Sequence, residues 1–483
     1  MLAEIKGLNE ECGVFGVWGH EDAAQMTYYG LHSLQHRGQE GTGIVVSDGD
    51  KLKVTKGLGL VTEVYGATQM KELTGKAAIG HVRYSTSGGG GYENVQPLLF
   101  RSQSGSLALA HNGNLVNANA LKHQLEGQGS IFQTTSDTEV LAHLMRRSGY
   151  FSLEDRVKNS LSMLKGAYAF LMMTENQLMA ALDPLGMRPL SLGRIGDAWV
   201  IASETCAFDV VGAEYVREVE PGELLIIDDN GLRSERFSSS MDRAICSMEY
   251  IYFARPDSNV DQLNIHSVRK RLGKQLAKET AIDADIVTGV PDSSISAAIG
   301  FAEETGIPYE LGLIKNRYVG RTFIQPSQEL REQGVKMKLS PVRGIVEGKR
   351  VVMVDDSIVR GTTSRRIVQM LRQAGAKEVH VRISSPPIIS PCYYGIDTST
   401  SSELIASSKS IDEICELIGA DSLSYLSVDG MIEAVGRKDS GANCGHCLAC
   451  FTGNYPTEIY TDTSLPHEKE RMGSHHSVQG ANS

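Results

Sequence analysis

The sequence has no apolar run that approaches the ~20 residues needed to cross a membrane, and its first residues lack the basic start and apolar stretch of a secretory signal. We therefore expect a cytoplasmic protein with no membrane partner. The chain also lacks an excess of positive charge, since its formal net charge is -11, which argues against a nucleic-acid binder with a broad basic face. Small anionic ligands stay possible, because local loops rather than net charge form their sites.

The length of 483 residues exceeds the usual size of a single hydrophobic core, so two or three domains are expected. Up to about residue 240, short strand-like runs alternate with Gly-rich turns, and helices are expected near 22–35 and 137–147. After about residue 250 the order becomes strand, loop, helix and strand, which is typical of parallel βαβ units. The predicted fold class is therefore α/β and α+β.

The most specific stretch is VVMVDDSIVRGTTSRR, in which an apolar strand leads through two carboxylates into a Ser/Gly/Thr loop and a helix. Loop N–H groups and a helix N-terminus suit a phosphate, and the Thr362 and Thr363 hydroxyls add donors. Asp355 and Asp356 can accept hydrogen bonds from sugar hydroxyls or act near a divalent cation. The alternative is an ordinary strand end with a helix cap, but capping does not require two adjacent acids.

This stretch resembles the signature of the type I phosphoribosyltransferases, which bind phosphoribosyl pyrophosphate. The resemblance implies that this substrate is bound by Asp355, Asp356, Ser357, Arg360, Gly361, Thr362 and Thr363. VTGVPDSS resembles the family's loop near the pyrophosphate, with Ser293 contributing to a magnesium site beside Asp355 and Asp356. The alternative interpretation of VTGVPDSS is a plain turn, which uses the same residue types.

Between these two motifs lies KNRYVGRTFIQPSQELREQGVKMKL, which is long, cationic and weakly periodic. Such a segment suits a lid that closes over an anionic substrate and excludes water. Its candidate anion contacts are Lys315, Arg317 and Arg321. A solvated surface loop is the alternative interpretation.

The first half contains, in order, CGVFG, LQHRGQEGTG, GHVRYSTSG, HNGN and SDTE. Taken one at a time, these motifs are weak evidence for a function, since an Asn-Gly pair, for example, is usually a turn. Together they resemble the class II glutamine amidotransferases, whose nucleophile is an N-terminal cysteine. The resemblance implies Cys12 as the nucleophile, Asn112 and Gly113 as the oxyanion hole, Arg83 as the partner of the glutamine α-carboxylate and Asp137 as the partner of its α-ammonium.

Cys12 is internal, and this position conflicts with the predicted role. A free α-amino group has an ordinary pKa of ~7.7–8.0 and can serve as the base of an N-terminal cysteine. That amine appears only when the Glu11–Cys12 bond is broken, so we expect residues 1–11 to be a propeptide. A buried structural role would be favoured for an isolated cysteine, but the neighbouring motifs favour the nucleophile.

Together the two halves resemble the amidotransferases that transfer ammonia from glutamine to C1 of 5-phosphoribosyl 1-pyrophosphate, giving 5-phosphoribosylamine, glutamate and pyrophosphate. This is the first committed step of purine (IMP) synthesis, and the family implies Mg²⁺, purine nucleotide inhibitors and a homo-oligomer, dimer or tetramer. The implied domains are a propeptide (1–11), an N-terminal-nucleophile αββα glutaminase domain (12–245), a phosphoribosyltransferase domain with a parallel sheet and a C-terminal cluster-binding segment (246–470), and a disordered tail (471–483).

Two alternatives have other functions. A hexosamine-forming amidotransferase shares the glutaminase motifs, but VVMVDDSIVRGTT argues against its sugar-isomerase partner domain. A non-catalytic regulator could keep a phosphoribosyl-binding fold as a sensor of phosphoribosyl pyrophosphate. It would need no glutaminase half, and the sequence shows no separate basic module.

The sequence has eight cysteines, and clustered cysteines in a reducing cytosol favour a metal site or catalysis over disulfides. NCGHCLAC presents C-x-x-C-x-x-C, a spacing that allows zinc or an iron–sulfur cluster. One branch of the resembled family combines a cleaved propeptide with a 4Fe-4S cluster. Position within that branch implies Cys246, Cys392, Cys447 and Cys450 as ligands and leaves Cys444 spare, although Cys444 with Cys447 has the same spacing.

Overall fold

The computed structural model describes residues 12–84, 91–103, 105–147, 152–239, 242–316, 339–396, 398, 401–436 and 445–460. The predicted propeptide (1–11), the predicted tail (471–483), Arg317, Arg321 and Cys444 lie outside these residues. Within the described ranges, no helix is long and apolar enough to cross a membrane.

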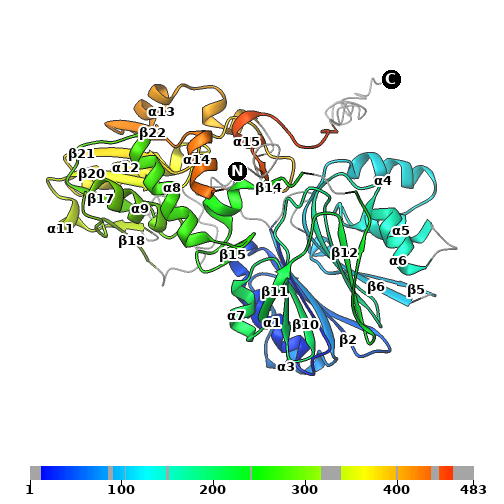
Figure 1. Ribbon diagram of the computed structural model, residues 1–483. Coiled ribbons are helices and arrows are strands. Elements are labelled where there is room, and N and C mark those ends of the chain that lie inside the picture. Colours follow the sequence, from blue (N-terminus) through cyan, green and yellow to red (C-terminus); the bar gives the residue numbers. More distant parts are fainter. Residues whose placement is uncertain are drawn as a thin grey trace, which may run out of the picture.

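The first half of the chain forms two antiparallel β-sheets (Figure 1). Their strand orders are β11-β9-β10-β1-β4-β2-β3 and β13-β12-β8-β7-β6-β5. The first sheet consists of β1 (Gly13–Trp18), β2 (Gly41–Ser47), β3 (Leu52–Leu58), β4 (Ala77–Arg83), β9 (Ser191–Ile195), β10 (Ala198–Ala202) and β11 (Glu214–Glu218). The second consists of β5 (Leu98–Ser102), β6 (Gly105–Leu115), β7 (Gly166–Met173), β8 (Leu178–Leu182), β12 (Glu223–Asp228) and β13 (Gly231–Arg236).

Central strands bury both of their faces, and alternate residues serve different cores. On β7, Ala169 and Leu171 pack between the two sheets, whereas Tyr168 and Phe170 pack against outer helices. Those helices are α4 (Ala118–Gly127), α5 (Glu139–Arg147) and α6 (Leu153–Leu161) on the second sheet, and α1 (Ala23–Ser33) and α7 (Cys206–Val211) on the first. The layers are therefore α, β, β, α, which confirms the predicted fold, and the helices expected near 22–35 and 137–147 are α1 and α5.

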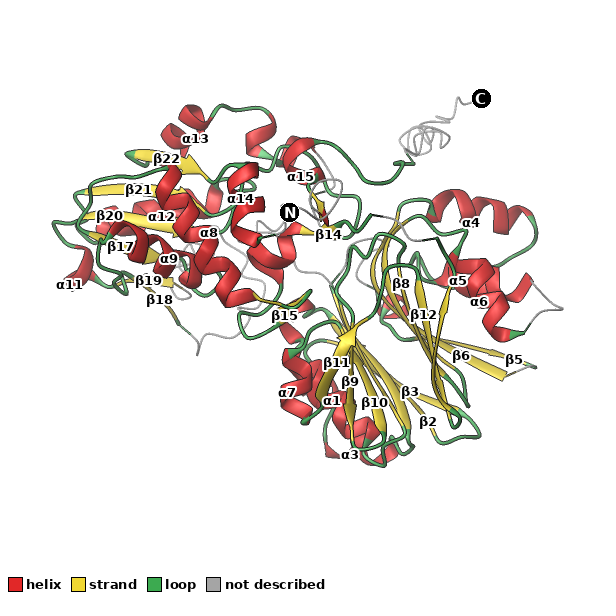
Figure 2. Cartoon of the chain, in the orientation of Figure 1, coloured by secondary structure: helices red, strands yellow, loops and turns green. Residues whose placement is uncertain are grey.

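The second half is built on a parallel sheet of order β17-β20-β21-β22 (Figure 2). Its strands are β17 (Ile286–Gly289), β20 (Arg350–Asp355), β21 (Glu378–Ile383) and β22 (Ser422–Tyr425). On one face pack α8 (Ile265–Glu279), α9 (Ile295–Thr305) and α14 (Val428–Val435), and on the other pack α11 (Arg343–Val346), α12 (Thr362–Gln373) and α13 (Ile411–Ile418). Along β20, Val352 and Val354 face the first group of helices, whereas Val351 and Met353 face the second. This arrangement confirms the predicted parallel sheet.

Shorter elements complete the described chain. They are α2 (Val61–Val64), α3 (Ala67–Glu72), β15 (Asn259–Val260), β16 (Leu263–Asn264), β18 (Leu313–Lys315), β19 (Leu339–Pro341), the π-helical turn η3 (Glu249–Phe253), and the short helical turns η1 (Gln35–Arg37), η2 (Tyr92–Asn94), η4 (Ser401–Glu403) and η5 (Ile405–Ser407).

Residues from both halves meet in a small shared core. The strand β14 (Ile245–Cys246) pairs in parallel with β23 (His446–Cys447), which precedes α15 (Ala449–Thr452). In Figure 1, β14 and α15 lie between the two halves. Met187 of the first half packs there with Tyr394 and Ala449 of the second. Because this core mixes both halves, the division at residue 245 stays a prediction.

Candidate active sites

Cys12 immediately precedes β1 at one edge of the first sheet. Gly13 pairs in register with Val82, so Cys12 and Arg83 lie at the same end of two neighbouring strands. Both side chains are buried, and the Cys12 thiol donates to the carbonyl of Tyr84 at 3.5 Å. The structure therefore brings the predicted nucleophile close to the residue predicted to hold the glutamine carboxylate.

Gly113 reaches the same edge from the second sheet. The opposite ends of the strands, away from Cys12, show how the two sheets are aligned. Ser47, the register partner of Ala77, donates there to the carbonyl of Glu175 at 2.7 Å. The Glu175 carboxylate accepts the Ser106 N–H at 2.9 Å. The starts of β4 and β6 thus lie together. Farther along, His81 Nε2 is 3.1 Å from the His111 carbonyl. Arg83 and Gly113 each follow these histidines by two residues, so both lie at the edge that holds Cys12.

The register of β6 and β7 directs the Gly113 N–H away from β7. Tyr168, the register partner of Gly113, donates its N–H to Asp183 Oδ2 at 3.2 Å and accepts the Asp183 N–H at 2.9 Å. Both backbone groups of Tyr168 therefore face β8, and in an antiparallel ladder the paired Gly113 must face the opposite way. On this side of β6, which faces away from β7, the Leu115 N–H donates to Asp137 Oδ2 at 2.9 Å.

Asn112 and Asp137 supply the remaining polar groups of this site. The side-chain amide of Asn112 is fully buried, and neither its nitrogen nor its oxygen has a hydrogen-bond partner in the described part of the chain. Burial acts to raise the pKa of Asp137, but His111 and the N–H groups of Leu115 and Thr138 outweigh it and hold this pKa below its ordinary value. A carboxylate that is charged at neutral pH can hold an ammonium group.

The paired acids of the second half lie at the carboxyl end of β20. Ser294 Oγ donates to Asp355 Oδ1 at 3.0 Å, and Ser293 Oγ donates to Asp356 Oδ2 at 2.5 Å. Ser357 Oγ donates to the other oxygen of Asp356 at 2.6 Å. Since β17 and β20 are parallel neighbours, the loops that follow them meet at one sheet edge, where ligands of such folds bind. Ser294 was not predicted from the sequence, although it adjoins Ser293 in the same motif.

Electrostatics make this carboxylate pair receptive to a cation. Burial and the adjacent Asp356 raise the pKa of Asp355 well above its ordinary value. Burial also raises the pKa of Asp356, although Ser293, Ser357 and the charge of Arg269 oppose the shift. A divalent cation would stabilise the ionised pair, and a set of carboxylate and hydroxyl oxygens fits Mg²⁺.

The start of α12 presents backbone and hydroxyl donors beside these acids. Gly361, with φ of +74°, precedes the helix, where a left-handed conformation favours glycine. The buried Thr363 Oγ1 has no hydrogen-bond partner among the described residues. Free donors at a helix N-terminus suit a phosphate, and Thr362 begins the helix at this point.

The predicted basic contacts are placed less uniformly. Lys315 Nζ lies 2.9 Å from Asp292 in the loop after β17, beside the predicted pyrophosphate position. Arg360 instead donates to Glu403 at 2.5 Å. Its guanidinium is therefore held by the turn η4.

The four cysteines predicted as ligands line one pocket, together with Arg188 and Tyr394 among others. Cys246 and Cys447 are register partners on β14 and β23, and the Cys450 carbonyl accepts the N–H groups of Ile389 and Ser390 near Cys392. Burial raises the pKa of Cys447 to about 12, with Cys392 adding to the shift. Yet no three His, Cys, Asp or Glu side chains in the described part of the chain are grouped so that they could hold a metal ion.

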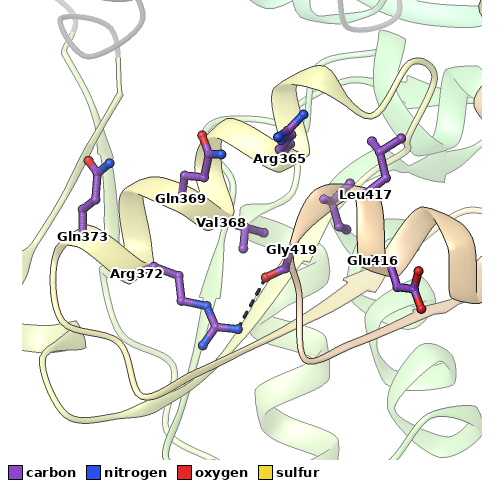
Figure 3. A pocket seen from close by; sticks show the side chains of 9 residues that line it. Arg365, Val368, Gln369, Arg372, Gln373, Glu416, Leu417 and Gly419 are labelled. Atoms are coloured by element: carbon purple, nitrogen blue, oxygen red, sulfur yellow. Dashed lines mark hydrogen bonds between the residues drawn. The ribbon is translucent and has the colours of Figure 1, made fainter.

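A separate hollow lies between α12 and α13 (Figure 3). Arg365 and Leu417 line it, and Arg372 donates across it to the Gly419 carbonyl at 3.4 Å. None of the residues predicted to bind substrate or metal lines this hollow. It belongs to the packing of the two helices rather than to either site.

Arg37 forms a buried ion cluster that the sequence analysis missed. Its guanidinium donates to Glu204 at 2.6 Å and to Glu249 at 2.6 and 3.0 Å, and its Nε donates to the Cys12 carbonyl at 3.2 Å. Arg37 stands in the quoted motif LQHRGQEGTG, but its partners are far away in sequence. Glu249 belongs to the second half, so the cluster joins the two halves behind Cys12.

Comparisons with known proteins identify the family. A model of the glutamine amidotransferase domain matches residues 81–210, and a model of the phosphoribosyl transferase domain matches residues 259–384. The chain is 75% identical over 473 residues to the amidophosphoribosyltransferase of Bacillus subtilis (strain 168), with 98% of this chain and 99% of that protein covered. The chain belongs to the amidophosphoribosyltransferase family.

Other members of the amidophosphoribosyltransferase family agree. The Staphylococcus aureus (strain N315) protein is 56% identical over 461 residues, which cover 95% of this chain and 93% of that protein. The solved glutamine phosphoribosylpyrophosphate amidotransferase from B. subtilis, complexed with ADP and GMP, has a TM-score of 0.90 and 74% identity and covers 94% of this chain and 100% of that chain. The predicted family, its enzymatic nature and the order of its two domains are confirmed.

Proposed function

We propose that this member of the amidophosphoribosyltransferase family hydrolyses glutamine at Cys12 and transfers the ammonia to C1 of 5-phosphoribosyl 1-pyrophosphate. The products are 5-phosphoribosylamine, glutamate and pyrophosphate, in the first step of purine biosynthesis. One observation carries the proposal: a single chain combines the Cys12 edge with the Asp355–Asp356 edge. A hexosamine-forming enzyme would not need the second site, and a sensor would not need the first.

In the glutaminase half, the Cys12 sulfur attacks the side-chain amide carbon of glutamine while Arg83 and Asp137 hold the α-carboxylate and the α-ammonium. The developing oxyanion accepts hydrogen bonds from the Gly113 N–H and the Asn112 amide, and each such donor is typically worth about 3 kcal/mol. The C–N bond then breaks and releases ammonia. Water attacks the resulting thioester, which releases glutamate and regenerates the thiol.

The base for this chemistry is the α-amino group of Cys12, freed by removal of residues 1–11. The support is chemical: an α-amino group has an ordinary pKa of ~7.7–8.0, so it can accept the thiol proton near neutral pH. Cleavage would supply a proton acceptor on the nucleophilic residue itself. The propeptide is therefore part of the proposal.

In the acceptor half, Asp355 and Asp356 orient the ribose hydroxyls, and the N–H groups and hydroxyls at the start of α12 hold a phosphate. Ammonia attacks C1 as pyrophosphate departs, with inversion at that carbon. Bound Mg²⁺, for which Ser293, Asp355 and Asp356 supply the oxygen environment, would offset the charge of the leaving group. Lys315, Arg317 and Arg321 would contact the pyrophosphate from the lid.

We also propose a 4Fe-4S cluster held by Cys246, Cys392, Cys447 and Cys450. The support is that four thiols from separate segments line one pocket. Four thiolates can hold either zinc or a 4Fe-4S cluster, and the resemblance to the cluster-containing branch of the family favours the cluster. The cluster would hold β14, the segment near Cys392 and α15 together rather than carry out redox catalysis.

The relative solved with ADP and GMP supports purine nucleotides as inhibitors of this chain. A cytoplasmic location and a homo-oligomer stay predictions. The deciding experiment measures phosphoribosylamine and glutamate with purified protein, glutamine and Mg²⁺, with and without phosphoribosyl pyrophosphate. Glutamate formation that never yields phosphoribosylamine would refute the proposed function.

A further inference from the structure

A segment of the acceptor half lies directly against the backbone of the oxyanion hole. The Asn114 side chain, one residue after Gly113, donates to the Tyr393 carbonyl at 2.8 Å. A Cβ built on Gly395 would lie 3.4 Å from the Gly113 carbonyl carbon and 3.5 Å from its Cα. Residues 393–395 therefore pack on the Gly113 peptide without a side chain in between.

A second contact fixes the same segment. Arg188 is fully buried and donates to the Tyr394 carbonyl. Its guanidinium also lies 2.9 Å from the position of a Cβ on Gly395. Gly395 has φ of +126°, a left-handed conformation that glycine adopts without strain. A larger residue there would meet both the arginine and the oxyanion peptide.

The opposite side of the Gly113 peptide is equally constrained. A Cβ on Gly113 would lie 2.1 Å from the Ala167 carbonyl oxygen, so β7 approaches as closely as a glycine permits. Asp183 holds the Tyr168 backbone on that strand, as described above. The oxyanion peptide is thus confined between β7 of its own half and residues 393–395 of the other half. Catalytic hydrogen-bond donors need such support, because a small displacement of the donor weakens transition-state binding.

We propose that Asn114 and Arg188 are positioning residues of the glutaminase reaction: they hold residues 393–395 of the acceptor half against Gly113 and so aim its N–H at the tetrahedral intermediate. This proposal rests on the function proposed above. Neither residue touches the reacting atoms. Their effect on the reaction passes through the Gly113 peptide.

The test compares Asn114→Ala with the wild type as full-length holoenzyme. Removing one oxyanion donor costs about 10²–10³-fold in kcat, so a misaligned donor is expected to cost about tenfold. The KM for glutamine should stay unchanged, and synthesis from ammonia should continue at the wild-type rate. Glutamate γ-semialdehyde, an aldehyde that adds the Cys12 thiol to form a tetrahedral adduct, should bind about tenfold more weakly. Iodoacetamide should alkylate Cys12 at the wild-type rate, because alkylation needs no oxyanion hole.

Asn117→Ala is the matched control. Asn117 donates to the Met163 carbonyl at 2.9 Å and accepts the Lys165 N–H at 2.9 Å, so its bonds stay within the first half. This variant should lose thermal stability but keep its kcat for glutamine. An equal loss of kcat in Asn117→Ala would show a general structural effect and would overturn the proposal.

Three results for Asn114→Ala would also overturn it: wild-type kcat, a parallel loss of ammonia-dependent synthesis, or unchanged affinity for the aldehyde. Should Asn114→Ala fail to fold, Gly395→Ala decides: its Cβ would lie 2.9 Å from the Arg188 guanidinium and would displace that anchor of residues 393–395, so the same loss of kcat at unchanged KM and unchanged ammonia-dependent synthesis is expected. A wild-type protein without glutaminase activity would instead refute the proposed function itself. The two failures are therefore distinguishable.

Discussion

Removal of the Arg37 guanidinium should destabilise the protein strongly, because the change leaves buried carboxylates without their cation. The side chains of Arg37, Glu204 and Glu249 are 1%, 0% and 0% exposed. Breaking such a buried pair by deleting one partner costs about 3–5 kcal/mol. Arg37→Met keeps an unbranched stem of similar length, so the cost should arise mainly from the uncompensated charge. We expect a loss of stability in that range, measured by urea unfolding of the holoenzyme.

The two carboxylates should not contribute equally. Glu204 keeps hydrogen bonds from His36, from Ser258 Oγ at 2.7 Å and from the Arg255 N–H at 2.9 Å. Glu249 is the carboxylate that loses two hydrogen bonds to Arg37. Adding Glu249→Gln to Arg37→Met should therefore recover about 1–3 kcal/mol, the penalty of an unsatisfied buried group.

Arg217→Met provides the control. Arg217 forms the same two-bond geometry with Glu223, at 2.6 and 2.8 Å; the Glu223 side chain is also buried, at 4% exposed, but that of Arg217 is 37% exposed, so solvent reaches one side of this pair. Solvent screens this half-open pair more than the fully buried one, so Arg217→Met should cost less than Arg37→Met. Because a chain of two halves need not unfold in one step, fluorescence and circular dichroism should both be followed. If Arg37→Met costs no more than Arg217→Met, the argument from buried charge is wrong.

Further predictions concern acidification and the two active sites. Burial acts to raise the pKa of Glu204, but His36 and Arg37 hold this pKa well below its ordinary value. The contribution of Glu204 to stability is therefore fully present above its unfolded pKa of about 4.3 and should be lost as the pH falls through the lower folded pKa. Urea unfolding midpoints measured against pH would show this loss. Cys12→Ala should abolish the use of glutamine but retain synthesis from ammonia, and N-terminal sequencing of active protein should begin at Cys12; full activity with Met1 retained would contradict the maturation. Asp355→Asn with Asp356→Asn should lose synthesis from either nitrogen source, and normal ammonia-dependent synthesis would show that these acids are wrongly assigned. Anaerobically purified protein should be brown, with about four iron and four sulfide per chain; colourless, active protein with stoichiometric zinc would exclude the cluster, whereas a cluster retained in Cys447→Ser would overturn only that ligand.

The acceptor site could be predicted largely from local sequence. Asp355, Asp356 and the start of α12 stand within one continuous stretch, where an apolar strand necessarily places the following residues at its carboxyl end. The parallel pairing of β17 with β20 then brings Ser293 to the same edge. Strand periodicity and the rules of βαβ connection were sufficient for this part.

The glutaminase site depended on resemblance, because its residues come from separate strands. Cys12, Arg83 and Gly113 converge only through the register of β1 with β4 and the contact between His81 and His111. Register within a sheet follows from pairings that leave no local period in the sequence. The order of the motifs therefore indicated the family before any physical argument could place the residues together.

Contacts between the halves carry no sequence signal, and two of those described above end on the backbone of the glutaminase site. Arg37 and Glu249 are separated by 212 positions, and Asn114 and Tyr393 by 279. The first contact supports the carbonyl of Cys12, and the second lies against the peptide of Gly113. If the first half were produced without the second, its Arg37 cluster would lack Glu249 and its Gly113 peptide would lack the support of residues 393–395. The nucleophile and the oxyanion hole thus belong to one half by sequence but take their final geometry from both.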